Sequence, residues 1–150
     1  MSKVSTHRAE RLRGKKKVVY TAQSAKNFHQ RMLICKFVFE QDAVPVNPFN
    51  LFGYFLYELV DRDLVRSGNN NILERCDELW MFGDVSDGML AEMRMFADTG
   101  KPVRFFDISR LPGKITATTL SKLPVEKHRP VLKATTAQAS KGSQFRRKRL

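Results

Sequence analysis

The distribution of apolar and polar positions along the chain predicts short strands that alternate with helices. Four runs rich in β-branched and aromatic residues have the length of strands, namely 17–22, 43–46, 78–82 and 102–106. Apolar residues recur at the three- or four-residue spacing of helices with one buried face over 25–41, 58–66 and 87–99. The weak helix formers at 67–71 leave open whether the second helix continues through 69–75.

This order of elements, β-α-β-α-β-α-β, predicts an α/β fold. The strands are mostly apolar, as in a parallel sheet covered by helices on both faces, and right-handed crossovers then give a doubly wound, Rossmann-like sheet. Pro45 lacks a backbone N–H, which predicts that the second strand lies at an edge. Ligands of such sheets bind beyond the carboxyl ends of the strands, here the loops 21–25, 47–50, 83–87 and 107–110.

The net charge of +12 is unevenly distributed along the chain. Residues 1–17 carry seven Lys or Arg and one Glu, and residues 109–150 carry eleven Lys or Arg and one Glu. The intervening residues 18–108 are acidic, with nine Lys or Arg against thirteen Asp or Glu. This asymmetry indicates an acidic folded part between two basic ends.

The charge pattern therefore sets the predicted domain boundaries. We predict a basic N-terminal tail at 1–16, a folded domain at 17–111 and a basic, mostly disordered C-terminal tail at 112–150, where sustained periodicity is absent. A dense basic cluster in the last tail is a candidate for nonspecific contact with nucleic-acid phosphates: Arg146, Arg147, Lys148 and Arg149.

Other protein classes lack support in the sequence. No apolar run approaches the roughly 18 residues of a membrane span, and no apolar segment of a secretory signal follows the basic start. Cys35 and Cys76 lie in apolar segments, as expected for reduced thiols in a cytoplasmic protein. A glycine-rich phosphate-binding motif is missing, and His7, His29 and His128 are too scattered for a metal site. We therefore expect neither a metal nor a cofactor.

One carboxylate near the third of these loops is a candidate for chemistry. Glu92 lies in the helix that follows Ser86, an N-cap candidate, and Tyr20 at the end of the first strand is placed to orient it. A carboxylate can attack or stabilise an anomeric carbon during N-glycosidic cleavage, while Asp84 or Asp87 protonates the departing base. In a plainer interpretation, Glu92 is a solvated helix residue, and Ser86 and Asp87 only cap the helix.

Five motifs occupy the predicted strands and the segments around them: VVYTA at 18–22, NP at 47–48, CDELWMFG at 76–83, SDGMLAE at 86–92 and GKPVRFF at 100–106. Together they resemble the nucleoside 2-deoxyribosyltransferases and the small bacterial and phage proteins related to them. The resemblance covers residues 17–107, and its most specific part is the order CDELWxFG followed by SxGMxxE.

The resemblance implies a flavodoxin-like sheet of order 2-1-3-4, to which a fifth strand can be added, and a homodimer or higher homo-oligomer. In the transferases, a glutamate after strand three attacks the sugar C1′ and a tyrosine after strand one orients it; Glu92 and Tyr20 match these two residues. The family also places small and polar residues of the loop after strand one against the sugar. That loop holds Thr21, Ala22, Gln23 and Ser24 here.

Further candidate substrate-binding residues lie in the other carboxyl-end loops and in the matching motifs: Asn47, Gly83, Ser86, Gly88 and Met89. The expected activity is cleavage of a nucleoside or nucleotide N-glycosidic bond, or transfer of the deoxyribosyl group, and the sequence leaves both open. The alternative is a nucleotide-binding module without catalysis, whose basic tails bind nucleic acid.

Overall fold

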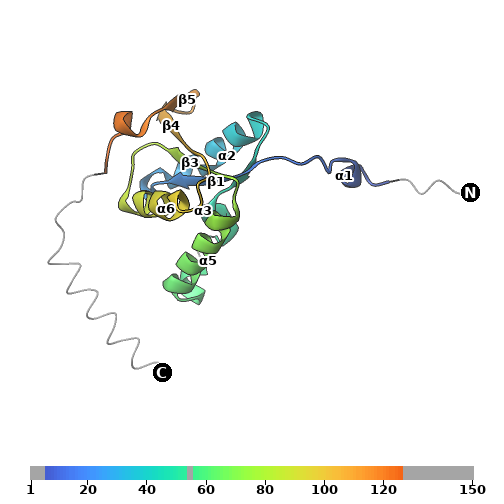
Figure 1. Cartoon of the computed structure of the whole chain (residues 1–150), viewed down its shortest axis with the longest axis horizontal. Helices are drawn as coiled ribbons and strands as arrows, with labels where there is room; N and C mark the ends of the chain where they lie inside the picture. Colours follow the sequence, from blue (N-terminus) through green and yellow to red (C-terminus); the bar gives the residue numbers. More distant parts are fainter. Residues whose placement is uncertain (1–5, 54–55, 127–150) are drawn as a thin grey trace, which may run out of the picture.

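The computed structural model describes residues 6–53 and 56–126, and its centre is a five-stranded sheet (Figure 1). The strands are β1 (Val18–Gln23), β2 (Val44–Val46), β3 (Glu78–Phe82), β4 (Val103–Arg110) and β5 (Lys114–Thr118). Their order in the sheet is β2-β1-β3-β4-β5. The first four strands are mutually parallel, and β5 pairs antiparallel with β4. The predicted flavodoxin-like α/β fold is confirmed, and Pro45 lies in an edge strand.

Helices connect the parallel strands, but the predicted helix 58–66 is interrupted, because one helix ends at Leu59 and the next begins at Arg62. They are α1 (Arg8–Arg11), the 3-10 segment η1 (Ala25–Gln30), α2 (Arg31–Glu40), α3 (Pro48–Leu51), α4 (Leu56–Leu59), α5 (Arg62–Arg75), α6 (Asp87–Ala97) and the 3-10 turn η2 (Leu120–Lys122). The predicted helix 25–41 therefore consists of two parts, with a kink at Asn27 (φ −101°, ψ 17°).

The helix α5 is continuous through the weak helix formers at 67–71, which settles the question that the sequence leaves open. Asp61 caps its first turn by accepting the Asp63 N–H at 2.8 Å. At its other end, the Lys101 ammonium donates to the carbonyls of Glu74 and Cys76, both at 2.9 Å. These contacts satisfy backbone groups that would otherwise lack partners at the two helix ends.

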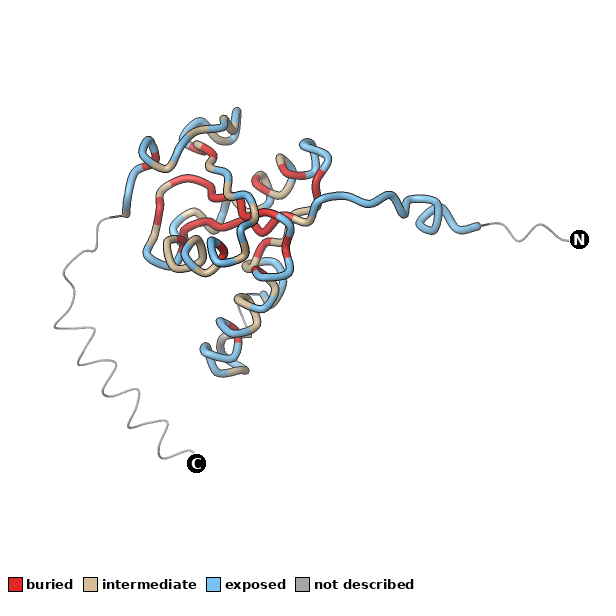
Figure 2. Tube along the Cα trace, in the orientation of Figure 1, coloured by how far each residue is buried: buried red, intermediate tan, exposed pale blue. Residues whose placement is uncertain are grey.

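The central strands of the sheet are buried (Figure 2). Successive residues of a strand point to opposite faces of the sheet. On one face, α5 and α6 pack over one half of the core: Tyr20, Ala22, Leu73, Leu79, Met81, Met89 and Phe96. On the other face, α2 covers the second half: Val19, Ile34, Val38, Trp80, Phe82, Phe106 and Ile108. All five residues of β3 are buried, because this strand lies in the middle of both halves.

The structure corrects the predicted end of the folded part. Beyond residue 111 the chain forms β5, turns through η2 and returns to the loop after β3, where Val125 bridges to Val85 in parallel fashion. Leu123 is buried in the core half under α6. Residues 112–126 therefore belong to the fold, because backbone pairing and one buried leucine hold a segment without helical periodicity. Residues 127–150 of the predicted tail lie outside the described residues.

The described residues of the N-terminal tail, 6–16, are exposed, including the short helix α1 (Figure 2). Within the described ranges, no helix has the length and apolar character needed to cross a membrane.

Gly83, the first residue after β3, is predicted to tolerate no side chain. Its φ is +76°, and a Cβ atom there would lie 2.8 Å from the Ile108 side chain. We expect Gly83→Ala to lower the free energy of unfolding by about 2 to 4 kcal/mol, from backbone strain together with overpacking. Urea unfolding of the purified protein measures this loss.

Gly100→Ala is the matched control. Gly100 also has a positive φ, +69°, but a Cβ there would meet nothing within 4 Å. It therefore reports the backbone strain alone, about 1 kcal/mol. Equal losses for the two variants would contradict the close-packing role of Gly83.

Candidate active site

Tyr20 and Glu92 meet in the core between the sheet and α6. Tyr20 is on β1 with 1% of its surface exposed, and its hydroxyl is hydrogen-bonded to the Glu92 carboxylate. The Glu92 Oε2 atom is buried and has no hydrogen-bond partner among the described residues. The solvated-helix interpretation of Glu92 is therefore wrong for its carboxyl group, although the side chain as a whole is only half-buried.

The surroundings of Glu92 favour its neutral form. Burial raises the pKa of the carboxyl group from 4.5 to about 7, and the hydrogen bond from Tyr20 partly opposes this rise. A carboxyl group with a pKa near neutrality, next to a phenol, can act as a nucleophile when ionised and as an acid when protonated. The structure thus brings Tyr20 and Glu92 together, as the sequence predicts, and the burial of Glu92 raises its pKa.

The loop after β3 places Glu92 through a helix cap. The Ser86 hydroxyl accepts the Met89 N–H at 3.3 Å, and the Met89 sulfur accepts the Ser86 N–H at 3.5 Å. Met89 is buried in the core, whereas Asp87 and Gly88 are exposed in the first turn of α6. Ser86 and Met89 therefore have structural partners, and any contact of these four residues with a substrate stays a prediction.

The polar residues predicted in the first loop lie in the strand instead. The strand β1 extends through Gln23, so Thr21, Ala22 and Gln23 are buried strand residues. The buried Asn47 side-chain amide donates to the Thr21 hydroxyl at 3.0 Å and to the Gln23 side-chain oxygen Oε1 at 2.9 Å. The Gln23 amide in turn donates to the backbone carbonyl of Asn27 at 2.6 Å. This network ties the ends of β1 and β2 to η1, and a role in substrate binding stays a prediction.

Ser24 connects the end of β1 to the C-terminal segment. Its hydroxyl donates to Glu126 Oε1 at 2.7 Å, and the Glu126 N–H donates to the Val85 carbonyl at 2.8 Å. Glu126 thus lies between the loops that follow β1 and β3, where sheets of this type bind ligands. Glu126 belongs to no motif of the sequence, and the only signal that marks it is its charge. It is the one acidic side chain in residues 109–150, which carry eleven Lys or Arg.

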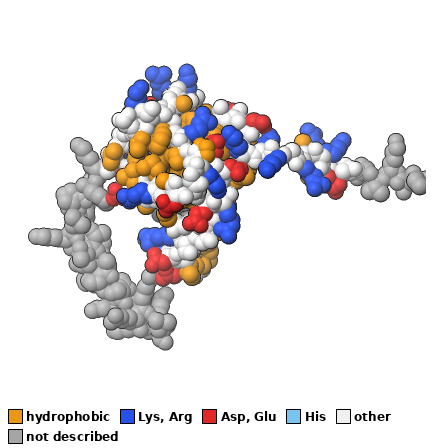
Figure 3. Space-filling model, in the orientation of Figure 1, with side chains coloured by type: hydrophobic (Ala, Val, Ile, Leu, Met, Phe, Trp, Pro, Cys, Tyr) orange, Lys and Arg blue, Asp and Glu red, His pale blue; other side chains and the backbone are white. Residues whose placement is uncertain are grey.

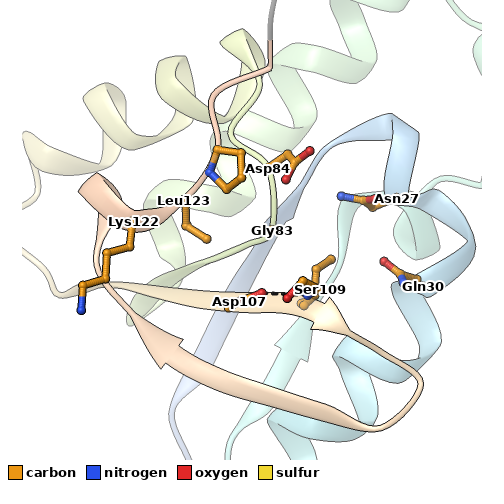
Figure 4. Close-up of a pocket in the computed structure, with 10 residues that line it drawn as sticks. Asn27, Gln30, Gly83, Asp84, Asp107, Ser109, Lys122 and Leu123 are labelled. Carbon is orange, nitrogen blue, oxygen red and sulfur yellow. Dashed lines mark hydrogen bonds between the residues drawn. The ribbon is translucent and has the colours of Figure 1, made fainter.

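Gly83 and Asp84 face a cavity of about 330 Å³ at the carboxyl edge of the sheet (Figure 4). The Asp84 carboxylate forms an ion pair with the Lys26 ammonium at 3.1 Å. Neither Tyr20 nor Glu92 is among the residues that line this cavity. The structure therefore places Asp84 in a different environment from the carboxylate it was predicted to assist, and its role as a proton donor stays a prediction.

The family of this chain follows from its similarity to a known domain family. Residues 18–106 match a family described as a domain of unknown function, DUF7768. The chain belongs to the DUF7768 family. The motifs around Tyr20 and Glu92 lie within the part of the chain that defines this membership, whereas β5 and the segment up to Glu126 lie beyond it.

A solved structure similar to this DUF7768 protein is a 2-desoxiribosyltransferase from Leishmania mexicana. The two share 17% sequence identity with a TM-score of 0.48, and the match covers 81% of this chain and 95% of that chain. No curated protein matches the chain. In the part of the DUF7768 chain that the structure describes, no three His, Cys, Asp or Glu side chains form a group suited to a metal ion.

Replacing Glu92 with Gln is expected to stabilise the protein at high pH. The pKa of Glu92 is about 7 in the folded state and 4.5 for an ordinary glutamate, the value taken for the unfolded chain. The folded state therefore binds the proton more tightly. The free energy of unfolding falls as the pH rises from 4.5 through 7. Glu92→Gln removes this ionisation and should raise the free energy of unfolding by roughly 3 kcal/mol at pH 8, relative to its effect at pH 4.5. Urea unfolding at the two pH values measures the difference.

Glu74→Gln, at an exposed position of α5, serves as the control and should show little dependence on pH. If Glu92→Gln changed the free energy of unfolding by the same amount at both pH values, ionisation of Glu92 would not destabilise the folded state. That result would contradict the raised pKa.

Proposed function

We propose that the chain cleaves or exchanges the N-glycosidic bond of a nucleoside or nucleotide, with Glu92 as the nucleophile. The observation that supports this most directly is the buried Oε2 atom of Glu92, which lacks a partner in the described structure while Tyr20 is hydrogen-bonded to the same carboxyl group. Buried polar atoms in folded proteins are almost always paired, so an unpaired carboxylate oxygen suggests a site that a substrate completes.

In the proposed reaction, the ionised Glu92 carboxylate attacks the sugar C1′ atom and forms an ester. The C1′–N bond breaks, and its electron pair leaves with the base, which takes a proton from Asp84, Asp87 or solvent. A water molecule or a second base then attacks C1′ and gives up a proton to the group or solvent that protonated the first base. The ester C1′–O bond breaks, which restores the Glu92 carboxylate. The first acceptor gives hydrolysis and the second gives transfer. The Tyr20 hydrogen bond orients the carboxylate and lowers the pKa of Glu92, which favours the reactive anion.

A base-release assay tests this proposal. Wild type and Glu92→Ala are incubated with deoxynucleosides, ribonucleosides and their monophosphates, and free bases are resolved by chromatography. We expect release by wild type and a loss on the order of a thousandfold or more in Glu92→Ala, because the covalent step is removed. Glu74→Gln should retain full activity. Equal release by wild type and a folded Glu92→Ala variant would exclude Glu92 as the nucleophile.

The same assay has an expected pH profile. Since attack needs the ionised carboxylate and the pKa of Glu92 is about 7, the rate should fall about tenfold for each pH unit below 7. Tyr20→Phe removes a hydrogen bond that lowers this pKa, so it should move the profile to higher pH.

A second candidate function, nucleic-acid binding, is favoured by the charge of the C-terminal segment. Residues 127–150 carry eight Lys or Arg and no Asp or Glu, and they lie outside the described residues, as do the candidate contacts Arg146, Arg147, Lys148 and Arg149. Lys and Arg side chains also gather at the end of the molecule that carries the β4–β5 hairpin (Figure 3), where Arg110 and Lys114 are exposed.

Deleting residues 127–150 is expected to weaken the binding of a DNA duplex and to flatten its salt dependence. Eight phosphate contacts correspond to a slope of log K against log salt of about −7, because each contact releases counterions. Fluorescence anisotropy between 50 and 200 mM NaCl measures both quantities. An unchanged affinity and slope after the deletion would exclude this function for the segment.

A further inference from the structure

The cavity beside Gly83 has the size and position of a small-molecule site. It opens at the carboxyl edge of the sheet, between η1, the loop after β3, the end of β4 and the segment after η2 (Figure 4). Its volume of about 330 Å³ is at the lower end for ligand sites, which suits a ligand of base or nucleoside size and not a dinucleotide.

Two side-chain amides in the lining are free to bind a ligand. Asn27 and Gln30 both belong to η1 and line the cavity, and Figure 4 shows the Asn27 amide directed toward it. Neither amide is hydrogen-bonded to another residue in the part of the chain that the structure describes. Each amide offers both a donor and an acceptor to a bound molecule.

The charges in the lining disfavour an anion. Asp84 and Asp107 contribute carboxylates, and hydrogen bonds from Ser109 hold the pKa of Asp107 below its ordinary value. Lys26 pairs with Asp84 at 3.1 Å, while the Lys122 ammonium is turned away from the cavity (Figure 4). A ligand that donates N–H groups to a carboxylate therefore fits better than one that carries a phosphate.

The other four lining residues carry no polar side-chain group. Ile108 and Leu123 are buried, Pro124 adds a ring, and Gly83 contributes no side chain. Six of the ten lining residues are polar, so the cavity combines apolar surface with several hydrogen-bonding groups. A flat heterocycle can use both, because it buries its faces and presents hydrogen-bonding groups at its edge.

We propose that this cavity binds a free nucleobase that carries an exocyclic amino group. The amino group donates to the Asp84 carboxylate, and the Asn27 and Gln30 amides bind ring nitrogens or a carbonyl at the edge of the base. The choice of a nucleobase among flat heterocycles rests on the proposed function, in which a free base is the product of hydrolysis and both the product and the acceptor of transfer.

Isothermal titration calorimetry on the full chain tests the proposal with adenine and cytosine, which carry amino groups, and with hypoxanthine and uracil, which do not. We expect adenine and cytosine to bind at least tenfold more tightly than their keto counterparts, and adenosine monophosphate to bind more weakly than adenine. Asp84→Asn and Asn27→Leu should each weaken adenine binding at least tenfold. The exposed Gln41→Leu, outside this cavity, should leave it unchanged.

Absence of base binding by wild type would overturn the inference, as would binding that folded Asp84→Asn and Asn27→Leu variants retain at full affinity. The measurement does not depend on turnover, because the titrations are repeated in a Glu92→Gln background. Adenine binding that depends on Asp84 and Asn27 supports the cavity site even where base release is absent, a result that overturns only the proposed function. Base release without such binding overturns only the cavity site.

Discussion

The burial of β3 on both of its faces is the constraint on which the rest of the structure depends. Leu79 and Met81 pack under α5 and α6, while Trp80 and Phe82 pack against α2, so neither side of the strand can shift without opening a core half. Hydrogen bonding to β1 on one side and β4 on the other fixes its register. The loop that begins at Gly83 is consequently held in one place, and it is this loop that starts α6 and borders the cavity.

Glu78 and Glu92 both have buried carboxyl oxygens, and they differ in what surrounds them. Glu78 at the start of β3 accepts the Lys17 ammonium at 3.0 Å and the Trp80 indole N–H at 2.7 Å, one on each oxygen. Glu92 has the Tyr20 phenol on its carboxyl group and no cation, and its Oε2 atom is unpaired in the described structure. A buried carboxylate normally has a compensating partner. Glu78 has the partners of a structural residue, whereas the unpaired, buried oxygen of Glu92 carries an energetic cost without such a partner in the described structure.

The sequence predicts the centre of the fold better than its rim, for a physical reason. Strands such as 78–82 are buried on both faces, so their composition alone identifies them, and Pro45 indicates an edge because of its missing N–H. In contrast, β5 and the segment to Glu126 are held mainly by backbone pairing and by the single buried Leu123, which leave little periodic signal. Tyr20 and Glu92 were found through motif order, but the burial that raises the pKa of Glu92 depends on tertiary packing.

The cavity escaped the sequence analysis for a related reason, since Asn27 and Gln30 resemble any polar residues on the outer face of a helix until β4 and the C-terminal segment are placed opposite them. The loop after β3 then links the two candidate sites. Gly83 and Asp84 border the cavity, Val85 packs in the core beside Leu123, and Ser86 caps the helix that carries Glu92. Val85 also pairs with the C-terminal segment through both its N–H and its carbonyl. Gly83 and Val85 of this short loop are buried, while Asp84 and Ser86 are partly exposed. The same four residues therefore position both the cavity lining and the N-terminus of α6.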